Sequence, residues 1–486
     1  MKILFVTPEL APWSKAGGLG DATVALGKAL AALGHDVRAV TPLYGSVPGR
    51  EQMGTLIETL KVGVGGDPRR AACRVRTLAV SPRFEAWFIE HEDFYGAREI
   101  YPAREDAGER AAFFGRAGLD ACLATSWIPD VIHCHDWTAG LVPVLLNTTL
   151  KSTALGGART VISIHNLQHQ GLHPRRLMAY LGLPEFLWSP QELECLGGVN
   201  FLKGGILHAG KVITVSPTYA QEILTPAFGY GLDEVVRRRA GALSGILNGV
   251  DGAYWNPQTD PHIAAHFNGA DLAGKHACNA ALRRECGLTE SAGPLFGVVS
   301  RLTAQKGLDL LLDALPGLVA AGGQLVVLGS GDAALEQRWQ ACAASHPGAV
   351  SVRIGYDEAF AHRIMAGSDV VLIDKDQESA EKGKAHSHKL MSEQVNRGRA
   401  TSAEREALMA RIVANKISKY NSQPIHIPEW DQRPRGSKRV LVVDRDAHCQ
   451  VTRDLAPSPD RELVVQEWDE FFDEYLSAPP SSPHPL

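Results

Sequence analysis

The sequence lacks several features that would place it in common classes of protein. No two of its eight cysteines form a Cys-x-x-Cys pair, which argues against the usual zinc and redox motifs. No run of about twenty apolar residues is present, so the sequence predicts no membrane span. Basic residues (49) do not outnumber acidic ones (54), and the net charge of −5 argues against nucleic acid as a partner.

The N-terminus has no recognisable secretory signal, because its first apolar run ends at Pro8 and is followed by Glu9. Scattered cysteines without a paired spacing are typical of free thiols in a reducing compartment. We therefore expect a cytoplasmic protein. Its 486 residues, 45% of them hydrophobic and 21% charged, are enough for two or three globular domains.

Short apolar runs alternate with segments of helical spacing along most of the chain. The runs with the composition of buried strands are 3–6, 37–40, 86–89, 131–134, 161–164, 212–215, 296–299, 325–328, 352–354 and 370–373. Helical spacing is found at 23–33, 111–124, 308–321 and 359–366. This alternation predicts an α/β protein with parallel sheets covered by helices on both faces. The strands are too many for one doubly wound sheet, so we expect two Rossmann-like domains.

Turn-forming residues are concentrated at 247–257, which contains Asn248-Gly249 and Asn256-Pro257. We therefore expect a first domain at 1–247 and the start of a second domain at 248–373. Two such domains facing each other would enclose a cleft, with ligands at the carboxyl ends of the strands. The remaining part, 374–486, has no regular alternation. Its expected elements are a helix at 402–417, a loop at 423–437, a strand at 439–443 and a helix at 463–476.

A glycine-rich turn follows the first predicted strand. Lys15, Gly17 and Gly18 stand where this strand passes into the N-terminus of a helix. Backbone N–H groups and the helix dipole attract anions at such a place, and glycine lets the backbone approach a ligand closely. The turn predicts a phosphate site with a lysine beside it, although a plain strand-to-helix turn can have the same residues.

Polar residues also follow two later strands of the first half. His133 and His135 alternate with Asp136, so the two imidazoles share one side of an extended chain and the carboxylate lies on the other. This favours a carboxylate that binds sugar hydroxyls, with Trp137 packed nearby, over a metal site. His165 follows the strand at 161–164 and is either a site residue or a capping histidine.

Two cations follow the first strand of the second half. Arg301 and Lys306 lie in the turn before the helix expected at 308–321, where they either bind a phosphate or are solvated basic side chains. A diphosphate leaving group needs fixed donors and cations aimed at its developing negative charge. Such signals at strand ends in both halves predict that a sugar nucleotide binds between the two domains.

Residues 1–373 resemble bacterial glycogen synthases and plant starch synthases, which are retaining glucosyltransferases with two facing Rossmann-like domains (GT-B type). The resemblance rests on ordered motifs, among them KILFVTPELAPWSKAGGLGD, HCHDWTAGLVP, SIHNLQHQG, GILNGVDGAYWNP and VVSRLTAQKGLDLLLDALP. The family's usual Lys-Thr-Gly-Gly-Leu has Ala16 in place of threonine here. The resemblance implies transfer of glucose from ADP-glucose to the non-reducing end of an α-1,4-glucan such as glycogen, with no metal or other cofactor.

The resemblance also implies the residues of the site. Those expected to bind ADP-glucose are Lys15, Gly17, Gly18, Asn248, Arg301 and Lys306. Those expected to act in catalysis are Asp136, His165, Arg301 and Lys306. The two cations would neutralise the diphosphate as ADP departs. The carboxylate and the imidazole would lie beside the glucosyl group, whose transition state would resemble an oxocarbenium ion.

The resemblance ends after Ile373. The family continues with Pro-Ser-Arg-Phe-Glu-Pro-Cys-Gly-Leu, an element that holds the donor, whereas this chain reads Asp374-Lys375-Asp376-Gln377-Glu378. Such an abrupt change is typical of a frameshift, a recombined gene or a misjoined gene, and a divergent tail is the other explanation. The alternative function is therefore a catalytically impaired homologue that binds only glucan or nucleotide.

Overall fold

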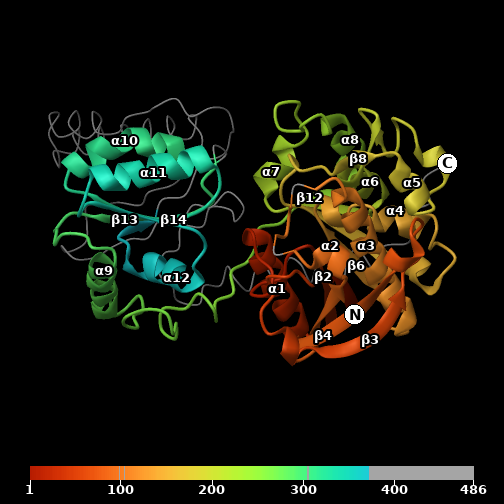
Figure 1. Ribbon diagram of the computed structural model, residues 1–486, viewed down its shortest axis with the longest axis horizontal. Coiled ribbons are helices and arrows are strands. Elements are labelled where there is room, and N and C mark those ends of the chain that lie inside the picture. The colour runs from red at the N-terminus through yellow and green to blue at the C-terminus, as the bar shows by residue number, and fades with distance from the viewer. Residues whose placement is uncertain (98, 103, 304–305, 372–486) are drawn as a thin grey trace. The chain divides into compact units, whose positions relative to one another are not determined.

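The computed structural model describes residues 1–97, 99–102, 104–303 and 306–371. These residues form two compact units, one from Met1 to Asp251 and one that begins at Gly252 (Figure 1). The change between the units falls inside 247–257, where the sequence concentrates its turn residues. The elements expected at 402–417, 423–437, 439–443 and 463–476 lie outside the described residues.

The first unit is built on a nine-stranded sheet with the order β12-β11-β7-β6-β1-β2-β5-β4-β3. Its parallel strands are β1 (Lys2–Val6), β2 (Asp36–Pro42), β5 (Phe84–Glu90), β6 (Val131–His135), β7 (Arg159–Ile164), β11 (Lys211–Thr214) and β12 (Leu243–Gly245). At one edge, β4 (Ala72–Ser81) and β3 (Gly54–Lys61) are added antiparallel. Every strand predicted in this unit is confirmed and belongs to this sheet, whereas three of its strands, β3, β4 and β12, were not predicted.

Consecutive residues of the central strand are buried, as Ile3 to Val6 of β1 show with no exposed surface. Because successive side chains of a strand point to opposite faces, this burial means that both faces are covered. The helices of the first unit are α1 (Gly18–Ala32), α2 (Glu92–Tyr95), α3 (Ala107–Ala124), α4 (Val142–Asn147), α5 (Arg176–Tyr180), α6 (Phe201–His208), α7 (Pro217–Glu222) and α8 (Asp233–Arg238). A small antiparallel sheet is formed by β8 (Leu172–Pro174), β10 (Gly198–Asn200) and β9 (Glu194–Cys195).

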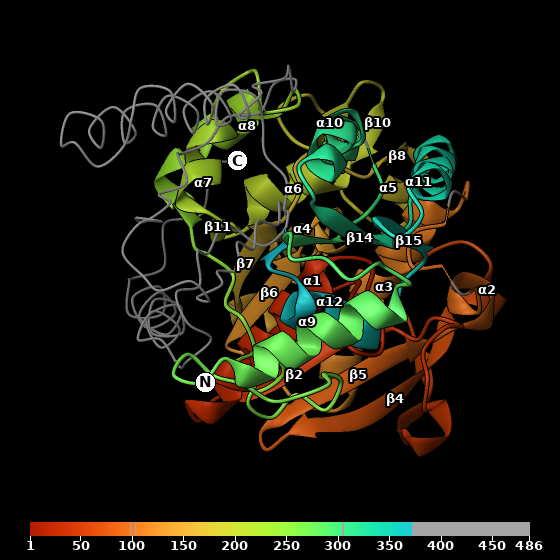
Figure 2. The same ribbon diagram turned by 90° about the vertical axis from the view of Figure 1, so that its left-hand side faces the viewer.

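The second unit is a parallel sheet with the order β15-β14-β13-β16 and two helical layers. Its strands are β13 (Leu295–Val299), β14 (Gln324–Gly329), β15 (Val350–Ile354) and β16 (Val370–Val371), and its helices are α9 (Ala273–Glu285), α10 (Leu308–Ala320), α11 (Ala333–Ser345) and α12 (Glu358–Gly367). Leu325 and Val327 of β14 belong to a core with α10 and α11, whereas Val326 and Leu328 belong to a core with α9 and α12. Figures 1 and 2 show these pairs of helices on opposite faces of the sheet.

Candidate functional site

The sheet of the first unit brings three predicted site segments to one edge. Strand β6 pairs in parallel with β1 on one side and with β7 on the other. The loop after β1 contains Lys15, the loop after β6 contains Asp136, and the loop after β7 contains His165. Because the carboxyl ends of neighbouring parallel strands meet at the same edge of the sheet, these loops are neighbours.

Asp136 is held directly against the end of β7. Its carboxylate accepts a hydrogen bond from the backbone N–H of His165 at 2.7 Å and a longer one from that of Asn166 at 3.4 Å. Its backbone φ is 54°, a positive value that residues other than glycine rarely adopt. Such conformations persist where the surrounding structure fixes them, often at functional sites. Asp136 and His165, which were predicted to act together, are therefore brought together.

Three imidazoles lie close to one another at the ends of β6 and β7. The rings of His133 and His135 are stacked with centroids 4.3 Å apart, so the prediction that they share one side is confirmed. Nδ1 of His135 lies 3.1 Å from Nε2 of His165, and Nε2 of His133 lies 2.7 Å from Oγ of Ser163. Burial lowers the pKa of His133 to about 3 and that of His135 well below its usual value, so both rings are neutral near pH 7.

The described ranges contain no group of three or more His, Cys, Asp or Glu side chains arranged to hold a metal ion. Within the same ranges, no helix is both long enough and apolar enough to cross a bilayer. The described cysteines are all free.

The glycine-rich turn is arranged around a carboxylate of the chain itself. Gly17 caps helix α1, and Gly18 is its first residue. The backbone N–H groups of Ala16 and Gly17 donate to Oε2 of Glu9 at 2.8 Å and 3.0 Å. Nζ of Lys15 lies 2.8 Å from a carboxylate oxygen of Asp21, in the first turn of the helix. The structure thus directs the N–H of Gly17 toward Glu9.

Glu9 was not among the residues predicted for the site. Only 3% of it is exposed, and its other oxygen, Oε1, accepts a hydrogen bond from the hydroxyl of Tyr101 at 2.7 Å. Burial raises the pKa of Glu9, and the three hydrogen bonds oppose that shift. No sequence pattern could have found this site, because Tyr101 is distant in the chain and the contact depends on the fold.

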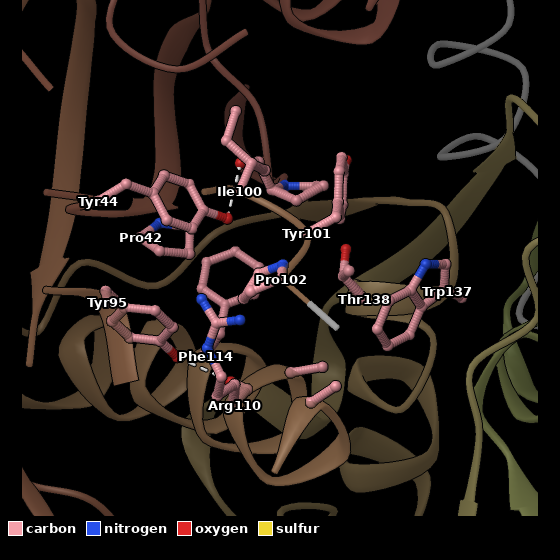
Figure 3. Close-up of a pocket in the computed structure, with 13 residues that line it drawn as sticks. Pro42, Tyr44, Tyr95, Ile100, Tyr101, Pro102, Arg110, Phe114, Trp137 and Thr138 are labelled. Carbon is pink, nitrogen blue, oxygen red and sulfur yellow. Dashed lines mark hydrogen bonds between the residues drawn. The ribbon is translucent and has the colours of Figure 1, made fainter. Parts of the chain in front are cut away.

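A cavity of about 190 Å³ lies beside Asp136 in the first unit (Figure 3). Trp137 and Thr138, which follow Asp136 directly, form one wall, and Ile100, Tyr101 and Pro102 form another. Figure 3 shows the guanidinium of Arg110 among aromatic rings. The remaining lining residues are Pro8, Pro42, Tyr44, Tyr95, Ala107, Ala111 and Phe114. Aromatic walls with a few polar groups are typical of small-molecule sites.

In the second unit, Arg301 and Lys306 follow the carboxyl end of β13, as predicted. Arg301 is partly buried, and Lys306 is only 4% exposed. The loop between them is tied to the neighbouring strand end, because the N–H of Leu302 donates to the carbonyl of Ser330 at 2.9 Å. Gly307 then adopts a left-handed conformation with φ 63° and caps helix α10.

Asn248 lies in the first unit, shortly after the carboxyl end of β12, and is partly buried. The predicted site residues are therefore divided between the units. Lys15, Gly17, Gly18, Asp136, His165 and Asn248 belong to the first unit, and Arg301 and Lys306 belong to the second.

The chain is similar to known proteins in sequence and in fold. The family model of the starch synthase catalytic domain matches residues 2–238. A glycogen synthase from Anaeromyxobacter sp. (strain Fw109-5) is 45% identical over 381 residues, which are 77% of this chain and 78% of that relative. A glycogen synthase from Myxococcus xanthus (strain DK1622) is 41% identical over 383 residues, 77% of this chain and 79% of the relative. The chain belongs to the glycogen and starch synthase family.

The solved catalytic domain of starch synthase IV from Arabidopsis thaliana, bound to ADP and acarbose, is 33% identical with a TM-score of 0.72. The match covers 76% of this chain and 77% of that chain. It confirms the predicted α/β class and the GT-B type of fold. The matched share of the chain agrees with the resemblance that the sequence motifs gave for residues 1–373.

Proposed function

We propose that this member of the glycogen and starch synthase family transfers glucose from ADP-glucose to the non-reducing 4-hydroxyl of an α-1,4-glucan, such as glycogen, with retention at the anomeric carbon. The names of its relatives support this reaction, as does the starch synthase structure that was solved with ADP and acarbose. The observation that carries the proposal is the carboxylate of Asp136, fixed by the N–H of His165 at 2.7 Å beside the loop that contains Lys15.

In the proposed reaction, Asp136 and His165 lie beside the glucosyl group. A carboxylate fixed by a backbone hydrogen bond stabilises positive charge that develops at the anomeric carbon, as the oxocarbenium-like transition state of glycosyl transfer requires. The neutral ring of His135 beside His165 adds no competing positive charge, because burial lowers its pKa.

The departing ADP requires positive charge at its diphosphate. Arg301, Lys306 and Lys15 are the cations that we assign to it, with Asn248 and Gly18 as further donor-binding residues. Lys306 is 4% exposed, so its charge is screened less by water than that of a surface lysine. Lys15 is fixed by its ion pair with Asp21 at 2.8 Å.

We assign the non-reducing end of the glucan to the cavity beside Asp136. Trp137 and Tyr101 offer aromatic surface to a sugar ring, and Arg110 and Thr138 offer hydrogen-bond donors to its hydroxyls. Because Thr138 and Trp137 follow Asp136 directly, an acceptor hydroxyl in this cavity would lie near the reacting carbon.

The reaction is tested with the purified full chain, ADP-glucose and glycogen, by measuring release of ADP. We expect turnover in the wild type and a loss of about a hundredfold in Lys15→Ala, because a charge aimed at the leaving group is removed. Lys151→Ala is the matched control, since Lys151 is an exposed lysine of the same unit. A wild-type chain without turnover, or equal rates in Lys15→Ala and Lys151→Ala, would contradict the proposal.

The second candidate function is binding of glucan or nucleotide without catalysis. It is favoured by the sequence from Asp374 to Glu378, which replaces the Pro-Ser-Arg-Phe-Glu-Pro-Cys-Gly-Leu element that the family resemblance implies for donor binding. Binding of glycogen or ADP by the wild type without turnover would support it. A chimera in which 374–486 is replaced by the corresponding part of the Anaeromyxobacter relative would then gain activity. Resequencing the codons for 365–385 would show whether a frameshift produced the tail.

We propose the cytoplasm as the place of this reaction, because the described cysteines are free thiols. Fractionation of cells that express the chain, followed by immunodetection, tests this assignment.

A further inference from the structure

We propose that Glu9 is a positioning residue that joins the Lys15–Gly17 loop to the wall of the cavity, so that occupation of the cavity and binding at the loop influence each other. This inference rests on the proposed function, because it takes the loop as part of the donor site and the cavity as the acceptor site. It adds Glu9 and Tyr101 to the residues that the reaction depends on.

The first connection runs from Glu9 to the loop. Oε2 of Glu9 accepts the N–H of Ala16 at 2.8 Å and that of Gly17 at 3.0 Å. These are adjacent N–H groups just before helix α1, the kind of place that binds an external anion in other proteins. Here the carboxylate of Glu9 occupies that place. The loop is therefore held from inside the protein, and Lys15 is presented at a fixed position beside Asp21.

The second connection runs from Glu9 to the cavity. Oε1 accepts the hydroxyl of Tyr101 at 2.7 Å, and Tyr101 lines the cavity together with Ile100 and Pro102 (Figure 3). The residue before Glu9, Pro8, also lines the cavity, and its carbonyl accepts the hydroxyl of Tyr44 at 3.0 Å. A ligand in the cavity would thus contact Pro8, the residue before Glu9, and Tyr101, the hydrogen-bond partner of Glu9.

The burial of Glu9 argues that this arrangement has a use beyond packing. Only 3% of Glu9 is exposed, and removing a carboxylate from water is unfavourable unless its oxygens are hydrogen-bonded. Both oxygens are hydrogen-bonded here, to two different segments. Tyr101 is half exposed and lines the cavity, so a ligand there would contact its side chain, while its hydroxyl is buried against Glu9. Because one carboxylate contacts both the Lys15–Gly17 loop and Tyr101 at the cavity, a ligand that shifts one of these contacts can change the affinity at the other site.

Amide hydrogen exchange tests the first connection without any need for activity. We expect the amides of Ala16 and Gly17 to exchange at least about tenfold faster in Glu9→Ala than in the wild type, because their acceptor is lost. Glu9→Gln keeps an acceptor oxygen and should restore most of the protection. Glu51→Gln, at an exposed acid of the same unit, is the control. Equal exchange in Glu9→Ala and the wild type would overturn the inference.

Calorimetric titration with ADP, which cannot donate glucose, with and without saturating maltotriose, tests the second connection. We expect maltotriose to change the affinity of the wild type for ADP and to have at most a twofold effect in Tyr101→Phe, which cuts one connection and leaves the loop contacts in place. For Glu9→Ala we expect a KM for ADP-glucose raised by about tenfold with a smaller change in kcat.

The same effect of maltotriose in Tyr101→Phe as in the wild type would overturn the coupling. If Glu9→Ala does not fold, Glu9→Gln and Tyr101→Phe still decide between the outcomes. If the wild type shows no turnover, the proposed function fails, whereas amide exchange still decides whether Glu9 holds the loop.

Discussion

The carboxylate of Asp136 accepts the backbone N–H of His165 at 2.7 Å, which joins the loops at the ends of β6 and β7. The two residues are far apart in the chain, and the pairing of these parallel strands brings them together. The hydrogen bond directs one carboxylate oxygen, so Asp136 keeps a fixed orientation at the edge of the sheet.

Asp136→Asn separates the charge of this residue from its geometry. The amide oxygen of asparagine can still accept the N–H of His165, but the negative charge is lost. We expect kcat to fall by about a hundredfold with little change in KM, because the charge acts mainly on the transition state. Initial rates of ADP release at varied ADP-glucose measure both constants. A kcat within twofold of wild type would remove Asp136 from the catalytic set.

His133 makes the stability of the first unit depend on pH. Burial lowers its pKa to about 3, whereas the unfolded chain titrates this group near its ordinary value of 6.5. Between these values the unfolded state binds more protons, so the free energy of unfolding falls as the pH decreases below 6.5, by about 1.4 kcal/mol per pH unit for this one group. Above pH 6.5, His133 is neutral in both states and does not make the free energy of unfolding depend on pH.

Urea unfolding from about pH 7.5 to about pH 4.5 measures this slope. Glutamine at this position can still hydrogen-bond to Ser163 but does not titrate. In His133→Gln, the dependence of the free energy of unfolding on pH should therefore be shallower by about 1.4 kcal/mol per pH unit, which corresponds to one proton. Identical slopes for the two proteins would show that His133 is not kept neutral by the fold.

Gly140→Ala should destabilise the turn that follows Asp136. A Cβ on Gly140 would lie 2.3 Å from the carbonyl oxygen of Phe201, which begins helix α6, so backbone must move. We expect a loss of about 2–3 kcal/mol in the free energy of unfolding. Gly157→Ala is the matched control, because a Cβ there would meet no atom within 4 Å and should change stability by less than about 0.5 kcal/mol. Equal stability of the two variants in urea unfolding would contradict this account.

In the second unit, His362 is expected to be a strong determinant of stability. Its Nδ1 lies 2.6 Å from Oδ2 of Asp260, and its ring stacks on that of Trp255 with centroids 3.9 Å apart. His362 is 1% and Asp260 is 5% exposed. His362→Ala removes the stacked ring and leaves a buried carboxylate without this partner, which should cost about 3 kcal/mol.

Thermal unfolding of His362→Ala compared with His276→Ala checks this expectation, since His276 is exposed on α9 of the same unit. We expect the midpoint to fall clearly in the first variant and to stay near the wild-type value in the second. A midpoint for His362→Ala that matches the control would show that the stacked pair contributes little.

The missed elements differ from the predicted ones in their exposure. Parallel strands such as β1 are buried on both faces, and continuous apolar runs therefore reveal them. In contrast, β3 has mostly exposed or half-buried residues and lies at the edge of the sheet, so it gives no such run. Strand β12 is only three residues long. Helix α1 begins at Gly18, earlier than the expected 23, because its first turn is rich in glycine and carries little helical pattern.

By itself, the sequence determined the alternation of strands and helices and the polar residues at the strand ends. Apolar runs and turn-forming residues are local features, so they can be recognised from residues that are adjacent in the chain. The family resemblance of 1–373 also came from the sequence, and the comparisons with known proteins bear it out. Only the tertiary structure decided that Asp136 is fixed by His165 and that Glu9, rather than an external anion, accepts the N–H groups of Ala16 and Gly17. The reason is that these contacts join residues from separate loops, and strand order and side-chain burial set their distances.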